Sequence, residues 1–373
     1  MPNATAVDSG KSPVFCVLGA GHGGLAMAGH LAIMGFTVNL FNRTEERIWA
    51  VRQRGGVELQ GEIEGFGKLN IVTHRVEEAI RDAEVLMIVV PATAHRYLAE
   101  TCAPHLKDGQ IIILNPGRTL GAIEFKQVLK EKGCTADVVV SEAQTLIYAS
   151  RATNPGQAKI FRIKNSVPLA SIPAYKIPDV LKIIRTAYPQ FAPGTNVLRT
   201  SFDNIGAIFH PGITVLNSGW IEDKHDFEFY VQGASISVCR VLEKLDEERV
   251  AVAAALGINS ITAREWLYRA YDVSGRSLYE AMMANVGYRG ILAPSSLNVR
   301  YLTEDVPMSL VPVASLGEML GVGTPTTKSL IHLASMIQGV DYWAEGRTVE
   351  KLKIAGLSVK DLRLLAIGEE GPQ

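Results

Sequence analysis

Hydrophobic residues in the first half of the chain form short continuous runs that alternate with helix-like segments. The run 85–90 holds six apolar residues in succession, which indicates a strand buried on both faces, as in a parallel sheet. Repeated strand–helix alternation of this kind predicts a doubly wound α/β domain. The expected strands are 14–18, 36–41, 85–90, 110–114, 137–141 and 159–164, and the expected helices are 25–34, 45–54, 94–103 and 120–132. The glycine-rich stretch 55–72 predicts a small antiparallel excursion.

The second half of the chain has a different pattern. From Asn204 onward the apolar positions recur at helical spacing, most clearly in 238–256, which stops at Gly257, and again in 315–320 and 326–336. We expect the boundary in the turn at Pro193 and Gly194. The predicted organisation is a disordered extension at 1–12, an α/β domain at 13–193 and an all-helical domain at 194–373.

Composition narrows the class of protein. The 373 residues are 47% hydrophobic and 20% charged with a net charge of −1, and no basic run is present, so nucleic acid and anionic membrane are not expected partners. The four cysteines are scattered without a C-x-x-C pair, which argues against a disulfide framework or a metal site and favours a cytoplasmic location. We find no signal-peptide pattern and no apolar run long enough to span a bilayer.

A glycine-rich turn joins the first expected strand to the first expected helix. It has the form G-x-G-x-x-G, which at this position is typical of a dinucleotide-binding fold of the Rossmann type. The glycines permit a tight turn and close backbone approach to a pyrophosphate, which the helix N-terminus then attracts. The expected cofactor-binding residues in this turn are Gly19, Ala20, Gly21, His22, Gly23 and Gly24.

The end of the second expected strand indicates which dinucleotide is bound. NAD-binding proteins usually place Asp or Glu there to bind the ribose hydroxyls, whereas this chain has Asn42. Arg43 can pair with a 2′-phosphate and Thr44 can add a hydroxyl. The sequence therefore predicts a preference for NADP(H). The alternative is that Arg43 is a solvated surface residue and NAD is used.

Two further strands end in loops that contain proline. Pro91 follows the strand 85–90, and Asn115 follows the strand 110–114. Since ligands of open α/β sheets bind at the carboxyl ends of the strands, we expect both residues beside the nicotinamide half of the cofactor.

Catalytic candidates come from the helical half. His210 lies in an otherwise apolar helical run and is a candidate acid/base, although a buried structural histidine would give the same pattern. Arg300 could bind a carboxylate in bidentate fashion, and Asp305 could orient a histidine. A surface Arg–Asp pair is the alternative for these two residues.

Over nearly its whole length the chain resembles the octopine/nopaline (opine) dehydrogenases. The more specific marks are the helical segment that ends in His210-Pro211 and the Arg300-x4-Asp305 segment, together with the loop 114–119 and the run 142–148. The resemblance implies a helical domain like that of 6-phosphogluconate dehydrogenase, a His210–Asp305 pair that handles a proton, and a carboxylate-binding role for Arg300. Family members that use NAD carry an acidic residue where this chain has Asn42.

The activity implied by this resemblance is the reductive condensation of an amino acid with a 2-oxo acid. The amino group and the oxo group form an imine, which NADPH reduces. Both halves of the imine carry carboxylates, so we expect at least one further arginine besides Arg300, and Arg118 is our choice. Gln144, Thr145 and Asn204 are the remaining candidates for substrate binding.

Two other functions stay open at this point. One is an NADP-dependent 2-oxo/2-hydroxy acid reductase of the ketopantoate-reductase type, which commonly uses a lysine as acid/base. The lysines of the helical half considered for this role, Lys224 and Lys244, lie in highly charged stretches typical of solvated surface. The other is a non-catalytic NADP(H) sensor. The sequence leaves open which amino acid and oxo acid are used, the stereochemistry of the product, and whether the chain forms a homodimer.

Overall fold

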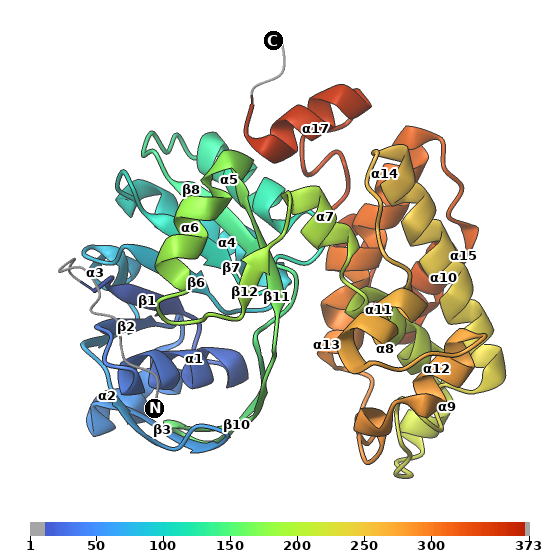
Figure 1. Cartoon of the computed structure of the whole chain (residues 1–373), viewed down its shortest axis with the longest axis horizontal. Helices are drawn as coiled ribbons and strands as arrows, with labels where there is room; N and C mark the ends of the chain where they lie inside the picture. Colours follow the sequence, from blue (N-terminus) through green and yellow to red (C-terminus); the bar gives the residue numbers. More distant parts are fainter. Residues whose placement is uncertain (1–11, 370–373) are drawn as a thin grey trace.

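The computed structural model describes residues 12–369 and consists of an α/β half and a helical half (Figure 1). Helix α7 (Val197–Phe202) lies between the two halves. The expected disordered extension lies outside the described residues except for Ser12. The division at residues 193 and 194 falls where strand β12 (Phe191–Pro193) ends.

An eight-stranded sheet forms the centre of the α/β half. Its order is β12-β11-β8-β7-β6-β1-β2-β5, and neighbouring strands are parallel except for β8 and β11, which are antiparallel. This arrangement confirms the predicted doubly wound fold. The strands are β1 (Phe15–Leu18), β2 (Val38–Phe41), β5 (Ile71–Thr73), β6 (Val85–Ile88), β7 (Ile111–Leu114), β8 (Val139–Ala143), β11 (Val167–Ile172) and β12.

Helices connect and cover these strands. The four expected in this half are present with small shifts at their ends, and the structure adds two short ones. Their bounds are α1 (His22–Ile33), α2 (Glu45–Arg54), α3 (Val76–Ile80), α4 (His95–Cys102), α5 (Gly121–Glu131) and α6 (Ile177–Ile184).

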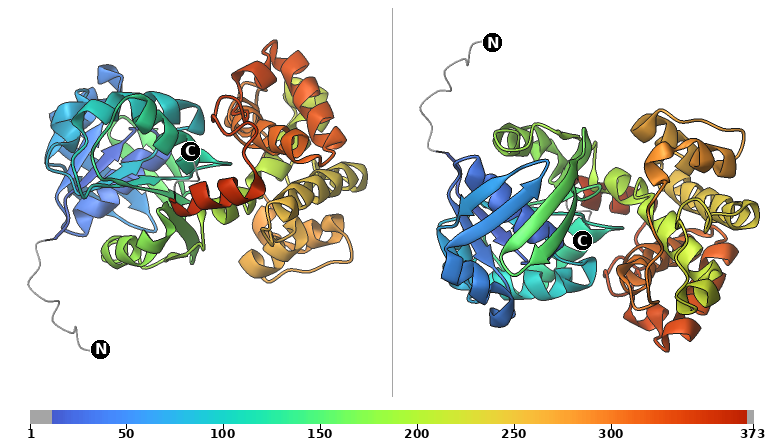
Figure 2. Two further views of the ribbon diagram at one scale, coloured as in Figure 1. Left: turned by 90° about the horizontal axis from the view of Figure 1, so that it is seen from above. Right: turned by 90° about the horizontal axis from the view of Figure 1, so that it is seen from below.

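A second sheet of four strands packs on α1, and the right-hand view of Figure 2 shows it on one face of the α/β half. The expected antiparallel excursion at 55–72 forms its β3–β4 pair, and the expected strand at 159–164 belongs to this sheet rather than to the main one. The strands are β3 (Gly56–Gly61), β4 (Gly65–Lys68), β9 (Tyr148–Asn154) and β10 (Gln157–Ile163).

The described part of the second half is helical, with one isolated β-bridge, as predicted. The expected helices at 238–256, 315–320 and 326–336 match α10, α14 and α15. Within the described residues, no helix is both long and apolar enough to cross a membrane. The helices are α8 (Gly206–Leu216), α9 (Ser218–Glu222), α10 (Ile236–Ala255), α11 (Ala263–Tyr271), α12 (Leu278–Ala284), α13 (Arg300–Thr303), α14 (Val311–Leu320), α15 (Pro325–Gln338), α16 (Tyr342–Glu345) and α17 (Val359–Ile367).

The C-terminal segment returns to the α/β half. Leu352, Ile354 and Leu362 are buried in the same hydrophobic core as the main sheet, and α17 packs against α7 and β11 (Figure 1). The buried Arg347 adds a polar link, since it donates to Glu124 of α5 at 2.7 and 2.9 Å. The two halves are therefore joined by packing as well as by the chain connection.

Candidate active site

A cleft of about 390 Å³ lies between the two halves. The α/β half contributes the end of the glycine-rich turn and the segments that follow strands β7, β8 and β10, and the helical half contributes α8 and a wall of aromatic side chains. This position at the carboxyl ends of parallel strands is where ligands of open α/β sheets bind. The aromatic residues are Phe209, Tyr230, Trp266, Tyr271 and Tyr288.

The glycine-rich turn has the geometry that a dinucleotide requires. Gly19 has a φ of +120°, and a Cβ there would lie 2.4 Å from the carbonyl oxygen of Val89. A Cβ on Gly24 would lie 1.8 Å from the carbonyl oxygen of Gly19, so this turn can pack on the helix only without side chains. Gly21 has open space beside it, and no side chain caps α1 there. The N-terminus of α1 can therefore accept a pyrophosphate.

The three residues after β2 differ in what they can contribute to cofactor binding. The Oδ1 atom of Asn42 accepts a hydrogen bond from the Ala20 backbone at 3.1 Å, and its Nδ2 donates to the Thr44 carbonyl at 2.9 Å, so this amide braces the turn. Arg43 is exposed and lies over the ring of Tyr97 at 5.2 Å. Thr44 is the N-cap of α2, and its hydroxyl makes no capping hydrogen bond.

Positive charge surrounds the turn. The pKa of His22 is lowered by burial and by the nearby guanidiniums of Arg151, Arg300 and Arg47. His22 Nδ1 also accepts from the Ala152 backbone at 2.9 Å, which holds the ring against β9. Arg300 was already a candidate from the sequence. Arg151 and Arg47 were not identified from the sequence, because β9 was not among the expected strands and Arg47 follows a run of acidic residues.

His210 and Asp305 lie together although neither their spacing nor the surrounding pattern requires it. The Nδ1 atom of His210 donates to Asp305 Oδ2 at 2.9 Å, and its ring stacks on Tyr301 with 4.4 Å between centroids. Asp305 is fully buried and precedes a π-helical turn at Val306–Leu310, a feature often found at functional sites. The Nε2 atom of His210 has no partner among the described residues, and the side chain lines the cleft.

Arg118 connects this pair to the α/β half. Its Nη1 atom lies 2.7 Å from Asp305 Oδ1, and its Nε donates to Glu304 at 3.2 Å. The two carboxylates raise the pKa of the guanidinium against the opposing effect of burial. Arg118 lines the cleft but is largely committed to protein carboxylates, and its substrate-binding role stays a prediction.

Glu304 is a further residue of the site that sequence reasoning did not single out. It is buried and accepts hydrogen bonds from the Ala92 backbone at 3.1 Å, from Arg118 and from Arg300 Nε at 2.7 Å. Burial favours its neutral form, but the two guanidiniums prevail and lower the pKa of Glu304 to about 2. Its i,i+4 spacing from Arg300 was the one signal available in the sequence.

The other predicted residues fall into two groups. Arg300, Gln144, Thr145 and Asn204 line the cleft, and the Arg300 side chain is 59% exposed with its terminal nitrogens unpartnered among the described residues. Pro91 and Asn115 do not line it. Asn115 is buried and donates to the Ile113 carbonyl, and its Oδ1 has no partner within residues 12–369.

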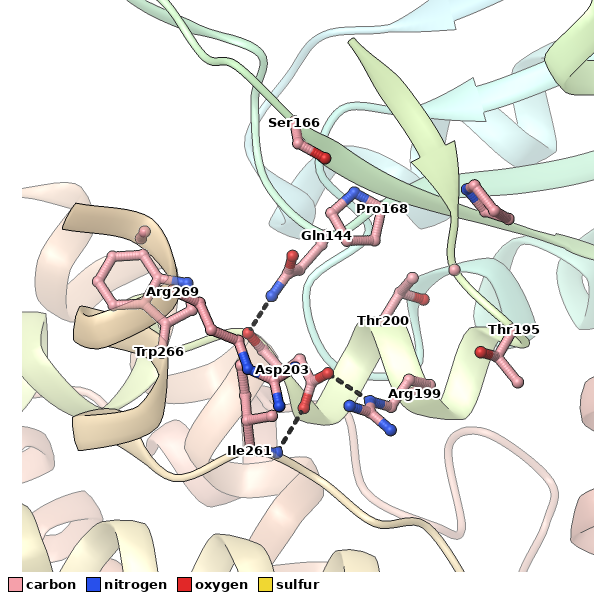
Figure 3. A pocket seen from close by; sticks show the side chains of 13 residues that line it. Gln144, Ser166, Pro168, Thr195, Arg199, Thr200, Asp203, Ile261, Trp266 and Arg269 are labelled. Carbon is pink, nitrogen blue, oxygen red and sulfur yellow. Dashed lines mark hydrogen bonds and ion pairs between the residues drawn. The ribbon is translucent and has the colours of Figure 1, made fainter. Parts of the chain in front are cut away.

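A second pocket of about 380 Å³ adjoins the cleft at the junction of the halves (Figure 3). Gln144, Asp203 and Trp266 line both spaces. Gln144 donates to the Asp203 carbonyl at 2.5 Å, and Arg199 donates to the Asp203 carboxylate at 2.5 Å. These bonds hold Asp203 between the pocket and the cleft.

Comparisons with known proteins agree with this geometry. Residues 193–338 match the alpha-helical domain of NAD/NADP octopine/nopaline dehydrogenase, and residues 14–142 match the NAD binding domain of 6-phosphogluconate dehydrogenase. An opine dehydrogenase from Arthrobacter sp. (strain 1C) is 37% identical over 354 residues, which cover 95% of this chain and 98% of that protein.

Solved structures share the fold. Octopine dehydrogenase with NADH and pyruvate superposes with a TM-score of 0.78 at 22% identity, covering 97% of this chain and 100% of that one. Yersinopine dehydrogenase with NADP+ gives a TM-score of 0.71 at 18% identity, covering 96% and 98%. The chain therefore belongs to the opine dehydrogenase family of NAD(P)-dependent oxidoreductases that act on CH–NH groups.

Proposed function

We propose that this protein catalyses the NADPH-dependent reductive condensation of an amino acid with a pyruvate-like 2-oxo acid, and the reverse oxidation. The observation that carries the proposal is the His210–Asp305 pair: His210 lines the cleft together with the end of the glycine-rich turn, and its Nε2 atom has no partner in the described part of the chain. A relative with the same fold binds NADH together with pyruvate, which supports a 2-oxo acid of this size.

In this reaction the amino group and the oxo carbon join with loss of water, and the resulting imine is reduced to a secondary amine. Bound at the N-terminus of α1, NADPH supplies the hydride. His210 holds the proton at the nitrogen of the imine or amine, a role worth roughly 10²–10⁴-fold in rate. Asp305 fixes the ring so that Nε2 faces the substrate and stabilises the charged form.

Arg300 has the chemistry to bind a substrate carboxylate. Its Nε is held by Glu304, which leaves the two terminal nitrogens directed away from that bond. A guanidinium fixed in this way can bind two carboxylate oxygens at once. Closure of the cleft around such a substrate would exclude water from the reacting atoms.

The preference for NADP(H) is part of the same proposal. The position directly after β2 holds Asn42 rather than a carboxylate, Arg43 is exposed there, and Arg47 lies close enough to the turn to affect the pKa of His22. These charges suit a 2′-phosphate better than a free hydroxyl. The described cysteines are unpaired, which supports a cytoplasmic location as a further proposal.

The experiment is a panel of amino acids against pyruvate, glyoxylate and 2-oxoglutarate, followed at the nicotinamide absorbance band with NADPH or NADH. The proposal expects oxidation of NADPH only when an amino acid and an oxo acid are both present. Consumption with the oxo acid alone would indicate the hydroxy acid reductase instead. No consumption with any pair would indicate the non-catalytic sensor.

A further inference from the structure

Under the proposed function, on which this inference rests, the enzyme needs two binding sites for carboxylate groups. The amino acid and the 2-oxo acid each carry one carboxylate, and the product keeps both. Arg300 can hold one of them. Arg118 is a poor choice for the other, since Asp305 and Glu304 already neutralise it. Besides Arg300, the cleft must therefore offer another cation, one whose charge is not already neutralised by protein carboxylates.

Lys164 is such a cation. It follows strand β10 and lines the cleft, and no carboxylate of the described residues pairs with it. Its Nζ donates to the hydroxyl oxygen of Thr145 at 2.6 Å, and its backbone N–H donates to the Ile147 carbonyl at 2.9 Å. Both bonds fix the ammonium group beside the segment that follows β8.

The geometry matches the two oxygens of a carboxylate. The ammonium of Lys164 keeps two N–H donors after binding Thr145, and the Thr145 hydroxyl keeps its own hydrogen to donate. A partly buried cation without a counter-ion is costly, and a bound anion would offset that cost. Consistent with this, burial and the Arg118 guanidinium lower the pKa of Lys164 to about 8.

The position indicates which substrate is bound. The hydride must reach the carbon of the former oxo group, so the 2-oxo acid has to lie on the cofactor side of the cleft. Lys164 and Thr145 belong to the α/β half, whereas Arg300 and the aromatic wall belong to the helical half. We propose that Lys164 and Thr145 form the binding subsite for the carboxylate of the 2-oxo acid.

The test measures binding of pyruvate to the enzyme–NADP+ complex by calorimetry, so that no hydride is available and no turnover occurs. Lys164→Met should weaken pyruvate binding by roughly 10- to 100-fold and leave NADP+ binding unchanged, which also shows that the variant is folded. Lys164→Arg keeps the charge and should recover most of the affinity. Lys159→Met is the matched control, because Lys159 is exposed on β10, the strand that Lys164 follows.

The subsite is wrong if Lys164→Met binds pyruvate as the wild type does, or if Lys159→Met weakens binding equally. It is also wrong if steady-state kinetics of Lys164→Met show a raised KM for the amino acid with an unchanged KM for pyruvate. If the wild type turns over an amino acid and an oxo acid together, these outcomes leave the proposed function intact. A wild type that turns over no pair of substrates counts against the proposed function itself.

Discussion

Arg118 Nη1 lies 2.7 Å from Asp305 Oδ1, so the loop after strand β7 is tied directly to the carboxylate that holds His210. The same guanidinium binds Glu304, which in turn accepts from the Ala92 backbone after β6. The two loops at the carboxyl ends of neighbouring strands thus share one charged network with the helical half. Alignment of the proposed proton donor with the cofactor depends on this network.

Arg118→Met should therefore damage both stability and turnover. The substitution leaves Glu304 and Asp305 buried without a full counter-charge, at a cost of about 3–5 kcal/mol in the free energy of unfolding. Urea unfolding measures this loss. Arg54→Met is the control, because both members of its pair with Glu58 are exposed and the pair should contribute less than about 1 kcal/mol. Equal losses of stability in the two variants would show that Arg118 contributes no more than an exposed arginine.

Glu304→Gln tests how much the charge of Glu304 contributes to stability at different pH values. The folded-state pKa of Glu304 is about 2, below the usual 4.5, so its charge stabilises the fold above pH 4.5 and that contribution is lost as pH falls towards 2. The variant should be less stable than the wild type by up to about 3 kcal/mol at pH 7. The difference should shrink below pH 4.5. Glu100→Gln, at an exposed pair, is the control, and a difference independent of pH would contradict this account.

Sequence patterns could predict the order of the first strands and helices, because each depends on apolar runs of a few neighbouring residues. They could not predict β11 or β12, where Pro168 and the three-residue length of β12 hide the strand pattern. Nor could they predict the return of α17 to the first core, since packing between distant segments leaves no periodic signal.

The candidate active site can likewise be predicted from the sequence only in part. The resemblance to opine dehydrogenases linked His210 to Asp305, and the structure places them 2.9 Å apart. The contact between Arg118 and Glu304 joins residues 186 positions apart, and no local pattern encodes it. Lys164 is the last residue of the expected strand 159–164, and only the fold shows that this end opens into the cleft.

The pH dependence of kcat/KM should also reveal the role of Lys164. The subsite needs the charged ammonium, so kcat/KM for the 2-oxo acid should fall as pH rises above about 8, the pKa of Lys164. Lys164→Arg should lose this fall, because a guanidinium stays charged throughout the range. A fall that persists unchanged in Lys164→Arg would assign it to another group.

The other groups that face Lys164 do not account for such a difference. Arg118 and Arg300 stay charged in this range, and burial keeps the Tyr148 hydroxyl neutral by raising its pKa. His210 is present in both proteins, so comparing the wild type with Lys164→Arg removes its contribution.

Arg43→Ala should change cofactor choice. Loss of a charged hydrogen bond to the 2′-phosphate predicts that kcat/KM for NADPH falls roughly 10- to 100-fold while the value for NADH changes little. Arg75→Ala is the control, since Arg75 is exposed at the start of α3 and pairs with Glu77 and Glu78. Equal efficiency of the wild type with NADH and NADPH would refute the proposed preference.

The most direct test of the central claim is the rate of NADPH oxidation by the wild type and by His210→Ala, each with an amino acid and pyruvate together. If His210 handles the proton at the nitrogen, the variant should lose about 10²–10⁴-fold in kcat while its affinity for NADPH is unchanged. Near-normal turnover by His210→Ala would contradict the account.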